Sequence, residues 1–270
     1  MNFLRRFLKN FKDHFFIKDI KAITVPTING NFLKNKTALI IGGNGGIGKA
    51  ILKAFFDNGC EQIVITGTNS SKLQETCNMF NRNVNYVMLD LKDLSMLERK
   101  LGESIKLLNN HIDIMVYAAG IHGPSDFWKV TESDFDSVMD LNVKAMFFCC
   151  QIIAKHMRNN NSGGHILCVS SASALKPGKT PYEISKNAVK SMVLGMSQEL
   201  ISYGIVVNCL APGPTATKML ARDNNESLRW PGNPSGRMAT AEEIANWAVM
   251  MVSSIGDYVV GDSIYVSGGS

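Results

Sequence analysis

A tyrosine and a lysine four residues apart, Tyr182 and Lys186, are the two side chains of this sequence with the clearest chemical use. Residues at this spacing lie on one face of a helix. An isolated tyrosine has a pKa of about 10 and is a poor proton donor near neutrality. An ammonium group beside it stabilises the phenolate and lowers that pKa. The pair therefore predicts a general acid or base acting on a carbonyl or an alcohol.

Two more polar side chains are candidates for the same site. Ser171 follows an apolar run at 165–170, so it would lie at the carboxyl end of a strand, where open α/β sheets bind ligands. Ser171 and Tyr182 could then hold one substrate oxygen. Asn142 interrupts an apolar helical pattern, and its amide competes with the backbone for hydrogen bonds. We expect it to kink the helix and to hold a water molecule.

A glycine-rich segment at 42–48 joins a short apolar run to a helical pattern. A strand that turns sharply into a helix directs free N–H groups and the positive end of the helix dipole at one point, which binds phosphate. Glycines are needed where a Cβ would block the pyrophosphate or the turn. The segment predicts a dinucleotide site that includes Gly42, Asn44, Gly45, Gly46, Ile47 and Gly48.

The end of the second expected strand, at Thr68, bears on the choice of cofactor. An acid there would hydrogen-bond the ribose of NAD, and none occurs in residues 65–72. Hydroxyl residues and the nearby Lys72 favour NADP, although no arginine is present and NAD stays open. After the third strand, Asp90 and Leu91 stand where an adenine-contacting acid would fall. Asp90 could equally cap a helix that starts near Lys92.

The elements that must position these residues alternate along the chain from residue 37. Short runs that are apolar throughout are typical of a parallel sheet covered on both faces. We predict an α/β fold, a Rossmann-type doubly wound, seven-stranded, mostly parallel sheet between two helix layers. The expected strands are 38–41, 63–66, 85–89, 112–117, 165–170, 206–210 and 263–266, and the expected helices are 46–58, 71–80, 92–109, 134–158, 181–203 and 241–253.

Composition excludes several classes of protein. With 45% hydrophobic and 19% charged residues in 270, the chain can form one large soluble domain. Most of the net charge of +5 lies in residues 1–21, so the rest lacks the basic face of a nucleic-acid-binding protein. The six cysteines show no CxxC pair and no metal-ligand spacing with histidine. We expect buried reduced thiols, no metal site and, without a signal peptide, a cytoplasmic location.

Residues 1–33 form an N-terminal basic amphipathic extension ahead of the domain expected over 34–270. Within it, phenylalanines recur every four residues at Phe3, Phe7, Phe11 and Phe15, with basic residues between them. This spacing predicts an amphipathic helix over residues 1–21. Such a helix could lie on an anionic membrane surface or pack on the domain or a partner subunit. Disorder is the third alternative.

Over about residues 34–269 the sequence resembles the short-chain dehydrogenase/reductase family, in its short single-domain branch, and is most similar to the 3-oxoacyl-(acyl-carrier-protein) reductases. A chain of this length has no room for the C-terminal substrate domain of the extended branch. The matching segments, in family order, are GGNGGIG (42–48), Asp90-Leu91, Ala118-Ala119-Gly120, Asn142, Ser171, YEISK (182–186), NCLAPGPTAT (208–217) and VSGG (266–269).

The resemblance implies an NAD(P)-dependent oxidoreductase that acts on a small carbonyl or alcohol substrate. In that family pattern Tyr182 exchanges the substrate proton, Lys186 holds the nicotinamide ribose, and Ser171 orients the substrate oxygen. Asn142 anchors a proton-relay water. Residues 214–236 form a lid, and its many Asn, Pro and Gly residues suit a loop that orders late. Further cofactor contacts implied by the resemblance are Ala119, Gly120, Pro212, Gly213 and Thr215.

Three positions depart from the family pattern. Ile41 replaces the threonine that usually opens the glycine segment, and Tyr117-Ala118 replaces a usual pair of asparagines. The spacing between Ser171 and Tyr182 is short, so Ser170 or Ser173 could share the role of Ser171. None of these changes removes a proton-transfer group.

The resemblance leaves the substrate open between a 3-oxoacyl chain and a sugar, polyol or other small alcohol. A carrier-protein substrate would favour basic residues near Tyr203, and only Lys155 and Arg158 on the preceding helix supply them. A non-catalytic dinucleotide-binding scaffold or sensor is the alternative from another class. The family also implies a homotetramer or homodimer formed through helices 134–158 and 181–203. The apolar candidates on those helices are Phe147, Phe148, Met192 and Met196.

Overall fold

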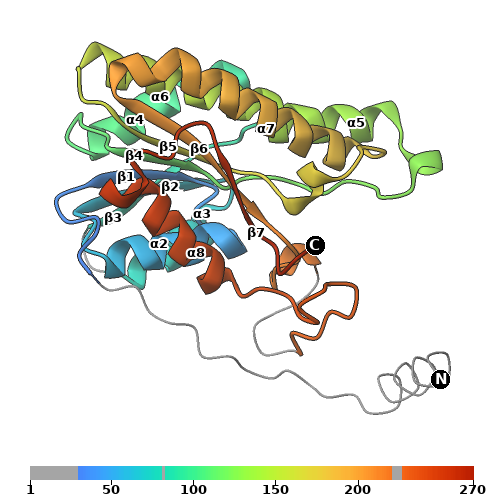
Figure 1. Ribbon diagram of the computed structural model, residues 1–270. Helices are drawn as coiled ribbons and strands as arrows, with labels where there is room; N and C mark the ends of the chain where they lie inside the picture. Colours follow the sequence, from blue (N-terminus) through green and yellow to red (C-terminus); the bar gives the residue numbers. More distant parts are fainter. Residues whose placement is uncertain (1–29, 81–82, 221–226) are drawn as a thin grey trace, which may run out of the picture.

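A sheet of seven parallel strands forms the centre of the computed structural model, which describes residues 30–80, 83–220 and 227–270. The strand order is β3-β2-β1-β4-β5-β6-β7, so the chain winds outward from β1 in both directions (Figure 1). The predicted doubly wound fold is confirmed, and every strand pair in it is parallel. The strands are β1 Thr37–Ile41, β2 Gln62–Gly67, β3 Val84–Met88, β4 Ile114–Tyr117, β5 Gly164–Val169, β6 Ile205–Pro212 and β7 Ser263–Val266.

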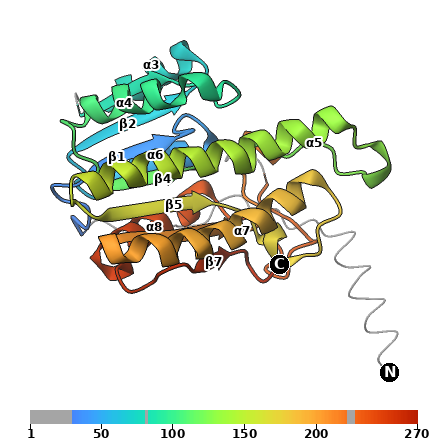
Figure 2. The same ribbon diagram turned by 90° about the horizontal axis from the view of Figure 1, so that it is seen from above.

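Helices cover both faces of this sheet. The longer helices are α2 Gly46–Asp57, α3 Ser70–Asn78, α4 Leu97–Leu107, α5 Glu132–Met139, α6 Ala145–Asn159, α7 Pro181–Leu200 and α8 Ala241–Val252. Helices α4, α6 and α7 pack on one face, and α2, α3 and α8 pack on the other (Figure 1). Figure 2 shows α5 and α6 in line as one long rod.

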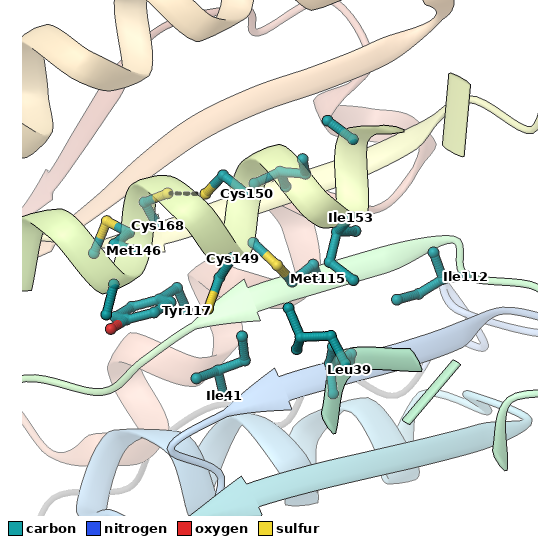
Figure 3. Packing of buried hydrophobic residues seen from close by; sticks show 14 of the residues in the cluster. Leu39, Ile41, Ile112, Met115, Tyr117, Met146, Cys149, Cys150, Ile153 and Cys168 are labelled. Atoms are coloured by element: carbon teal, nitrogen blue, oxygen red, sulfur yellow. Dashed lines mark hydrogen bonds between the residues drawn. The ribbon is translucent and has the colours of Figure 1, made fainter. Parts of the chain in front are cut away.

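A hydrophobic core lies on each face of the sheet, because successive side chains along a strand point to opposite faces. On β1, Leu39 and Ile41 face the core under α4, α6 and α7, whereas Ala38 and Ile40 face the core under α2 and α8. All five residues of β1 are buried, which explains its uninterrupted apolar run. All six cysteines are buried free thiols, as expected. Cys149, Cys150 and Cys168 lie in the first of these cores (Figure 3).

Two helix boundaries differ from the sequence-based expectation. The helix expected from Lys92 begins only at Leu97, after a 3-10 turn over Leu94–Met96 that is capped by Asp93. Asp90 instead accepts a hydrogen bond from the Lys92 amide (3.0 Å) in a local turn, so its expected role as a helix cap is wrong. The apolar periodicity of the sequence could not decide whether Asp90 or Asp93 caps the helix, because both aspartates precede the same apolar pattern.

The helix expected over 134–158 is not a regular α-helix throughout. A π-helical turn, η3, spans Asp140–Lys144 between α5 and α6 and contains Asn142. The kink expected at Asn142 is therefore wrong, because the irregularity is a widened turn in a rod that stays straight. Such turns leave some carbonyl groups without their usual partners and often occur at functional sites.

One helical stretch, Glu132–Asn159, is long and apolar enough to cross a membrane by length and composition. Many of its apolar residues, such as Met146, Cys149 and Ile153, are fully buried against the sheet, as in the core helix of a globular domain. The membrane hypothesis for residues 1–21 lies outside the described residues. Leu33, at the end of the expected extension, is fully buried in the domain core.

Candidate active site

The direction of winding reverses between β1 and β4, which are neighbours in the sheet. At such a point the loops that follow the two strands diverge and leave a crevice for a ligand. The loop after β1 turns at Gly42, whose φ of +81° disfavours residues with a side chain. A Cβ there would lie 2.8 Å from the amide nitrogen of Ala119 in the loop after β4. Glycine is therefore required for the two loops to meet.

The glycine loop leaves the start of α2 open. Gly45 caps α2 without any side-chain hydrogen bond, and the first turn holds no acid. By contrast, α5, α7 and α8 each start with a threonine capping box. The first N–H groups of α2 are thus free for an anion. Gly48 packs directly against the Gly42 carbonyl, and a Cβ on Gly46 would lie 2.7 Å from the side chain of Thr217. These features fit the pyrophosphate of a dinucleotide.

The residues expected at the adenosine end lie along the next two strands. Thr68 follows β2, and Asp90 and Leu91 follow β3, which pairs with β2. A Cβ on Gly67 would lie 2.7 Å from the side-chain oxygen of Asn44, so Asn44 covers the end of β2. Within the described residues, no acid occurs at this end of β2, as the sequence analysis noted.

The proton-transfer residues meet at the carboxyl ends of β5 and β6. Thr180 and Pro181 start α7, which projects Tyr182 from its first turn. Ser171 follows β5, and its hydroxyl lies close enough to the Tyr182 phenol to oppose the rise in the pKa of that phenol. Ser170, considered as an alternative, instead donates to the Lys186 carbonyl (3.1 Å) and is buried. The structure therefore brings Ser171, and not Ser170, to the phenol.

The pKa of Tyr182 is raised, whereas the sequence analysis expects it to be lowered. Burial raises the pKa of this phenol, and the Ser171 hydroxyl opposes that rise. The expected lowering by Lys186 is not found, since burial and Ser171 are the causes of the shift. The Lys186 Nζ atom lies 5.5 Å from the centre of the phenol ring and donates to the Val169 carbonyl (3.2 Å). Its charge is thus directed at the strand end more than at the phenol oxygen.

Lys186 itself is almost fully buried, at 4% exposure. Burial lowers the pKa of its ammonium group to about 8. Gly120 lies close by, since a Cβ there would be 3.7 Å from the Lys186 Nζ atom and 3.2 Å from the Asn142 side-chain oxygen. The end of β4, the π-helical turn and α7 therefore converge on one point.

Asn142 connects these three elements by its side chain. Its amide oxygen accepts from the Ile121 amide (3.0 Å), and its amide nitrogen donates to the Ile121 carbonyl (2.9 Å) and to the Ser185 hydroxyl (3.1 Å). The residue is fully buried. Both hydrogens of the side-chain amide nitrogen are therefore used in bonds within the protein.

Tyr117, at one of the positions that depart from the family pattern, supports the same turn. It is the last residue of β4 and is fully buried in the core shown in Figure 3. Its hydroxyl donates to the Leu141 carbonyl in the π-helical turn (2.7 Å). A tyrosine thus ties the strand end to the turn next to Asn142.

We expect Tyr117→Phe to lower Tm by a few degrees, because it removes the partly buried hydrogen bond to the Leu141 carbonyl, which contributes about 0.5–1.5 kcal/mol. The rate should fall severalfold as Asn142 loses its support. Tyr265→Phe is the matched control, since the Tyr265 hydroxyl is buried and has no hydrogen-bond partner in the described part of the chain. Thermal denaturation of both variants checks this. Equal melting temperatures for the two would contradict the support assigned to Tyr117.

These residues line a cavity of about 260 Å³. Ile47 from the glycine loop, Ala119 and Gly120 after β4, and Pro212, Gly213 and Thr215 after β6 form the wall where the resemblance places the nicotinamide. Tyr182, Lys186 and Ser171 line the same cavity. From the expected lid, Met219, Leu220 and Trp230 contribute apolar side chains, whereas residues 221–226 lie outside the described chain.

Sequence reasoning did not name several residues of the cavity wall, among them His122 and Lys176. Thr217 belongs to the NCLAPGPTAT segment and Trp230 to the expected lid, but neither was singled out. His122 stands two residues after Gly120, and its ring stacks on Tyr182 with centroids 4.3 Å apart and planes inclined by 25°. Lys176 carries no sequence signal, because only the folded loop brings it to the cavity.

Comparison with known proteins agrees with this geometry. Residues 36–228 match the short chain dehydrogenase family, and this protein belongs to that family. It is an oxidoreductase that uses a nicotinamide cofactor.

The sequence is similar to curated relatives with different substrates. It is 31% identical to the 3-oxoacyl-(acyl-carrier-protein) reductase of Chlamydia muridarum, with 88% of this chain and 98% of the relative covered. It is 30% identical to the gluconate 5-dehydrogenase of Gluconobacter oxydans, with 88% and 95% covered. Among solved structures, the gluconate 5-dehydrogenase of Burkholderia cenocepacia in complex with NADP and tartrate superposes with a TM-score of 0.79 at 25% identity, covering 89% of this chain and 96% of the other.

Proposed function

We propose that the protein interconverts a small carbonyl compound and its secondary alcohol, with Tyr182 as the proton donor in reduction and the acceptor in oxidation. The convergence of Ser171, Tyr182 and Lys186 on one cavity, which also includes Ile47 of the glycine loop, carries this proposal. A purely nucleotide-binding scaffold has no use for a partly buried tyrosine and a buried lysine in such a place.

Each residue then has a defined task. The open first turn of α2 would hold the pyrophosphate, and the wall that includes Gly120 and Thr215 would receive the nicotinamide, which supplies the hydride chemistry. Ser171 donates to or accepts from the substrate oxygen and sets its distance from Tyr182. Lys186 binds the ribose and stabilises negative charge on the phenol. Asn142 and its π-helical turn hold the water that resupplies the proton.

Oxidation of NADPH, followed at 340 nm against a panel of small ketones, aldehydes, oxo acids and 3-oxoacyl thioesters, tests the proposal. We expect steady consumption of NADPH with at least one class of carbonyl. A protein that binds NADPH but consumes none of it on the whole panel would favour the scaffold alternative. The 3-oxoacyl and sugar hypotheses stay open at this level, because relatives of both kinds are equally similar.

We propose NADP in preference to NAD. Thr68, Ser71 and Lys72 follow β2 without an acid, and α3 begins there with Asn69 as its cap. A lysine and hydroxyl groups suit a 2′-phosphate, whereas an acid would repel it.

Thr68→Asp should raise the dissociation constant for NADPH at least tenfold, which corresponds to about 1.4 kcal/mol, because its carboxylate faces the 2′-phosphate. Binding of NADH should be unchanged or tighter. Thr68→Asn, of similar shape but neutral, is the control and should change either constant much less. Quenching of protein fluorescence by each cofactor provides the measurement. Tighter binding of NADH than of NADPH by the unmodified protein would refute the preference.

A homotetramer or homodimer, formed through α6 and α7, is our proposal for assembly. An apolar groove between these helices has a volume of about 510 Å³ and includes Phe147, Met192 and Met196 in its wall. Phe147 and Phe148 are 40% and 39% exposed. The groove also contains Lys155 and Arg158, and Arg158 stacks over Tyr203. Exposed aromatic residues of this kind are enriched at protein interfaces.

Gly195→Glu should reduce the mass of the particle in light scattering. A Cβ at Gly195 meets nothing within 4 Å, so the subunit tolerates the change, but the new carboxylate would enter the groove beside Glu199. Ser191→Glu, exposed on the same helix but outside the groove, should leave the mass unchanged. A monomeric unmodified protein at micromolar concentration would end this proposal.

For location we propose the cytoplasm, since buried free thiols at all six cysteines suit a reducing compartment. An attachment of residues 1–21 to a membrane or to a partner remains a separate proposal. Removal of these residues, followed by co-sedimentation with anionic liposomes, tests it.

A further inference from the structure

The cavity beside Tyr182 has a marked imbalance of charge. Three basic residues, His122, Lys176 and Lys186, line it together with the C-terminal Ser270, and none of its described lining residues is an aspartate or glutamate. Lys186 has a task in the proposed reaction. His122 and Lys176 have none, although both lie on loops at the substrate end of the cavity.

His122 is held against the proton donor itself. Its ring stacks on the Tyr182 ring, and its Nδ1 atom lies 3.1 Å from the Gly123 carbonyl. Because a carbonyl only accepts, Nδ1 carries a proton in this contact, and Nε2 is left for a ligand. With both ring nitrogens protonated, Nε2 is a hydrogen-bond donor as well. The ring therefore offers a hydrogen bond to an anion beside the phenol.

Lys176 extends from a well-held backbone. Its amide donates to the Ser173 carbonyl (3.1 Å), and its carbonyl accepts from the side chain of Asn187 on α7 (3.1 Å). Its side chain forms no ion pair with any described acid. In contrast, other exposed lysines such as Lys53 and Lys144 pair with an aspartate four residues away on the same helix. Lys176 is thus a cation available to a ligand in the cavity.

The size of the cavity bears on that ligand. Its described part has a volume of about 260 Å³, must also admit the nicotinamide ring, and includes Leu220 and Trp230 in its lining. Binding pockets for drug-sized ligands range over about 300–1,000 Å³, so this volume favours a short substrate.

We propose that the substrate is a short oxo acid or hydroxy acid, whose carboxylate is bound by Lys176 and His122 while its carbonyl or hydroxyl oxygen is held by Ser171 and Tyr182. The binding of the carbonyl or hydroxyl oxygen by Ser171 and Tyr182 rests on the proposed function, whereas the binding of the carboxylate does not. In reduction the carbonyl carbon gains a hydride from the dihydronicotinamide, and the oxygen gains a proton from Tyr182. Oxidation of the hydroxy acid reverses both transfers.

The experiment compares 2-oxobutanoate, 4-oxopentanoate and 5-oxohexanoate with their methyl esters as substrates for the full chain. We expect kcat/KM for the best acid to exceed that of its ester at least tenfold. Lys176→Gln and His122→Phe should each remove most of this preference by raising KM for the acid, with less than a twofold change for the ester. Phenylalanine keeps the stacking on Tyr182, so a structural role alone would leave the preference intact.

Lys179→Gln is the control. This exposed lysine lies three residues from Lys176 on the same loop but outside the cavity wall, and only its backbone amide is bonded to Glu183. The preference for acids should survive this change. Equal kcat/KM for acids and esters, or equal loss of both in Lys176→Gln, would overturn the proposal while leaving the carbonyl reductase activity in place.

Calorimetric titration of the NADP⁺-saturated protein with the same oxo acids separates this proposal from the proposed function. Binding that is lost in Lys176→Gln, in a protein that turns over no carbonyl, would support the anion site and overturn the proposed reaction. Turnover of esters without any binding of the acids would support the proposed reaction and overturn the anion site. Absence of both binding and turnover would overturn both.

Discussion

Tyr182→Phe should lower kcat by about 10²–10⁴-fold, the usual contribution of a positioned general acid. The phenol oxygen is the only atom removed, and the ring still stacks on His122. Binding of NADPH should change less than threefold, because the open turn of α2 that we assign to the pyrophosphate does not include this hydroxyl. Steady-state kinetics with the best carbonyl substrate and a fluorescence titration with NADPH provide the two readouts.

Tyr258→Phe is the matched control, since Tyr258 is fully exposed and lies outside the cavity wall. Full activity in Tyr182→Phe would place the proton donor elsewhere, with the Ser171 hydroxyl as the next candidate. A loss of NADPH binding as large as the loss of rate would mean that the tyrosine serves the cofactor and not the proton.

The pH profile gives a finer test of the same group. The Ser171 hydroxyl opposes the rise in the pKa of Tyr182 caused by burial. Alcohol oxidation needs the phenolate and therefore gains rate as pH rises toward that pKa, whereas reduction needs the neutral phenol. Removal of this hydroxyl in Ser171→Ala should move the rising limb of the oxidation profile to higher pH.

Lys186→Met should abolish most of the activity and at the same time stabilise the fold at pH 7. Burial lowers the pKa of Lys186 to about 8, so at neutral pH the folded protein holds a buried charge that the unfolded chain exposes to water. Replacing a buried charge by an apolar side chain of similar length removes that cost. The gain, reduced by the loss of the bond to Val169, should be about 1–3 kcal/mol, or several degrees in Tm.

The pH dependence of this gain follows from the direction of the shift. Below pH 8 the lysine is charged in both the folded and the unfolded protein, and the folded protein bears the full cost. Between pH 8 and the ordinary pKa of 10.5, the folded protein releases the proton and the unfolded chain keeps it, so the unmodified protein gains stability with rising pH. The difference between the two proteins should therefore shrink from pH 7 to pH 10.

Lys190→Met, one turn further along α7 at an exposed position, is the control and should change Tm by less than a degree or two. A lower Tm for Lys186→Met than for the unmodified protein at pH 7 would show that the ammonium group is a net stabiliser. In that case the bonds of the Lys186 ammonium group would outweigh the cost of its desolvation. Its burial would then be explained by stability and would need no explanation from the reaction.

Much of the fold could be predicted because its signals are local. Uninterrupted apolar strands such as 38–41 indicate burial on both faces, and the glycines of 42–48 mark a turn into a helix; both features occur at the predicted places. Boundaries were less accurate where two neighbouring residues could both cap, as with Asp90 and Asp93. The π-helical turn at Asn142 was foreseen only as an irregularity, because its form depends on the hydroxyl of Tyr117 from another strand.

By itself, then, the sequence determined the family, the doubly wound sheet and the identity of the proton-transfer and cofactor candidates, because strand patterning and glycine spacing act within a few residues. Only the tertiary structure decided that Ser171 and not Ser170 reaches Tyr182, that burial and not Lys186 dominates the pKa of the phenol, and that His122 and Lys176 face the cavity. These properties arise from contacts between segments up to about sixty residues apart, and desolvation and the stacking of side chains exist only after those segments have packed.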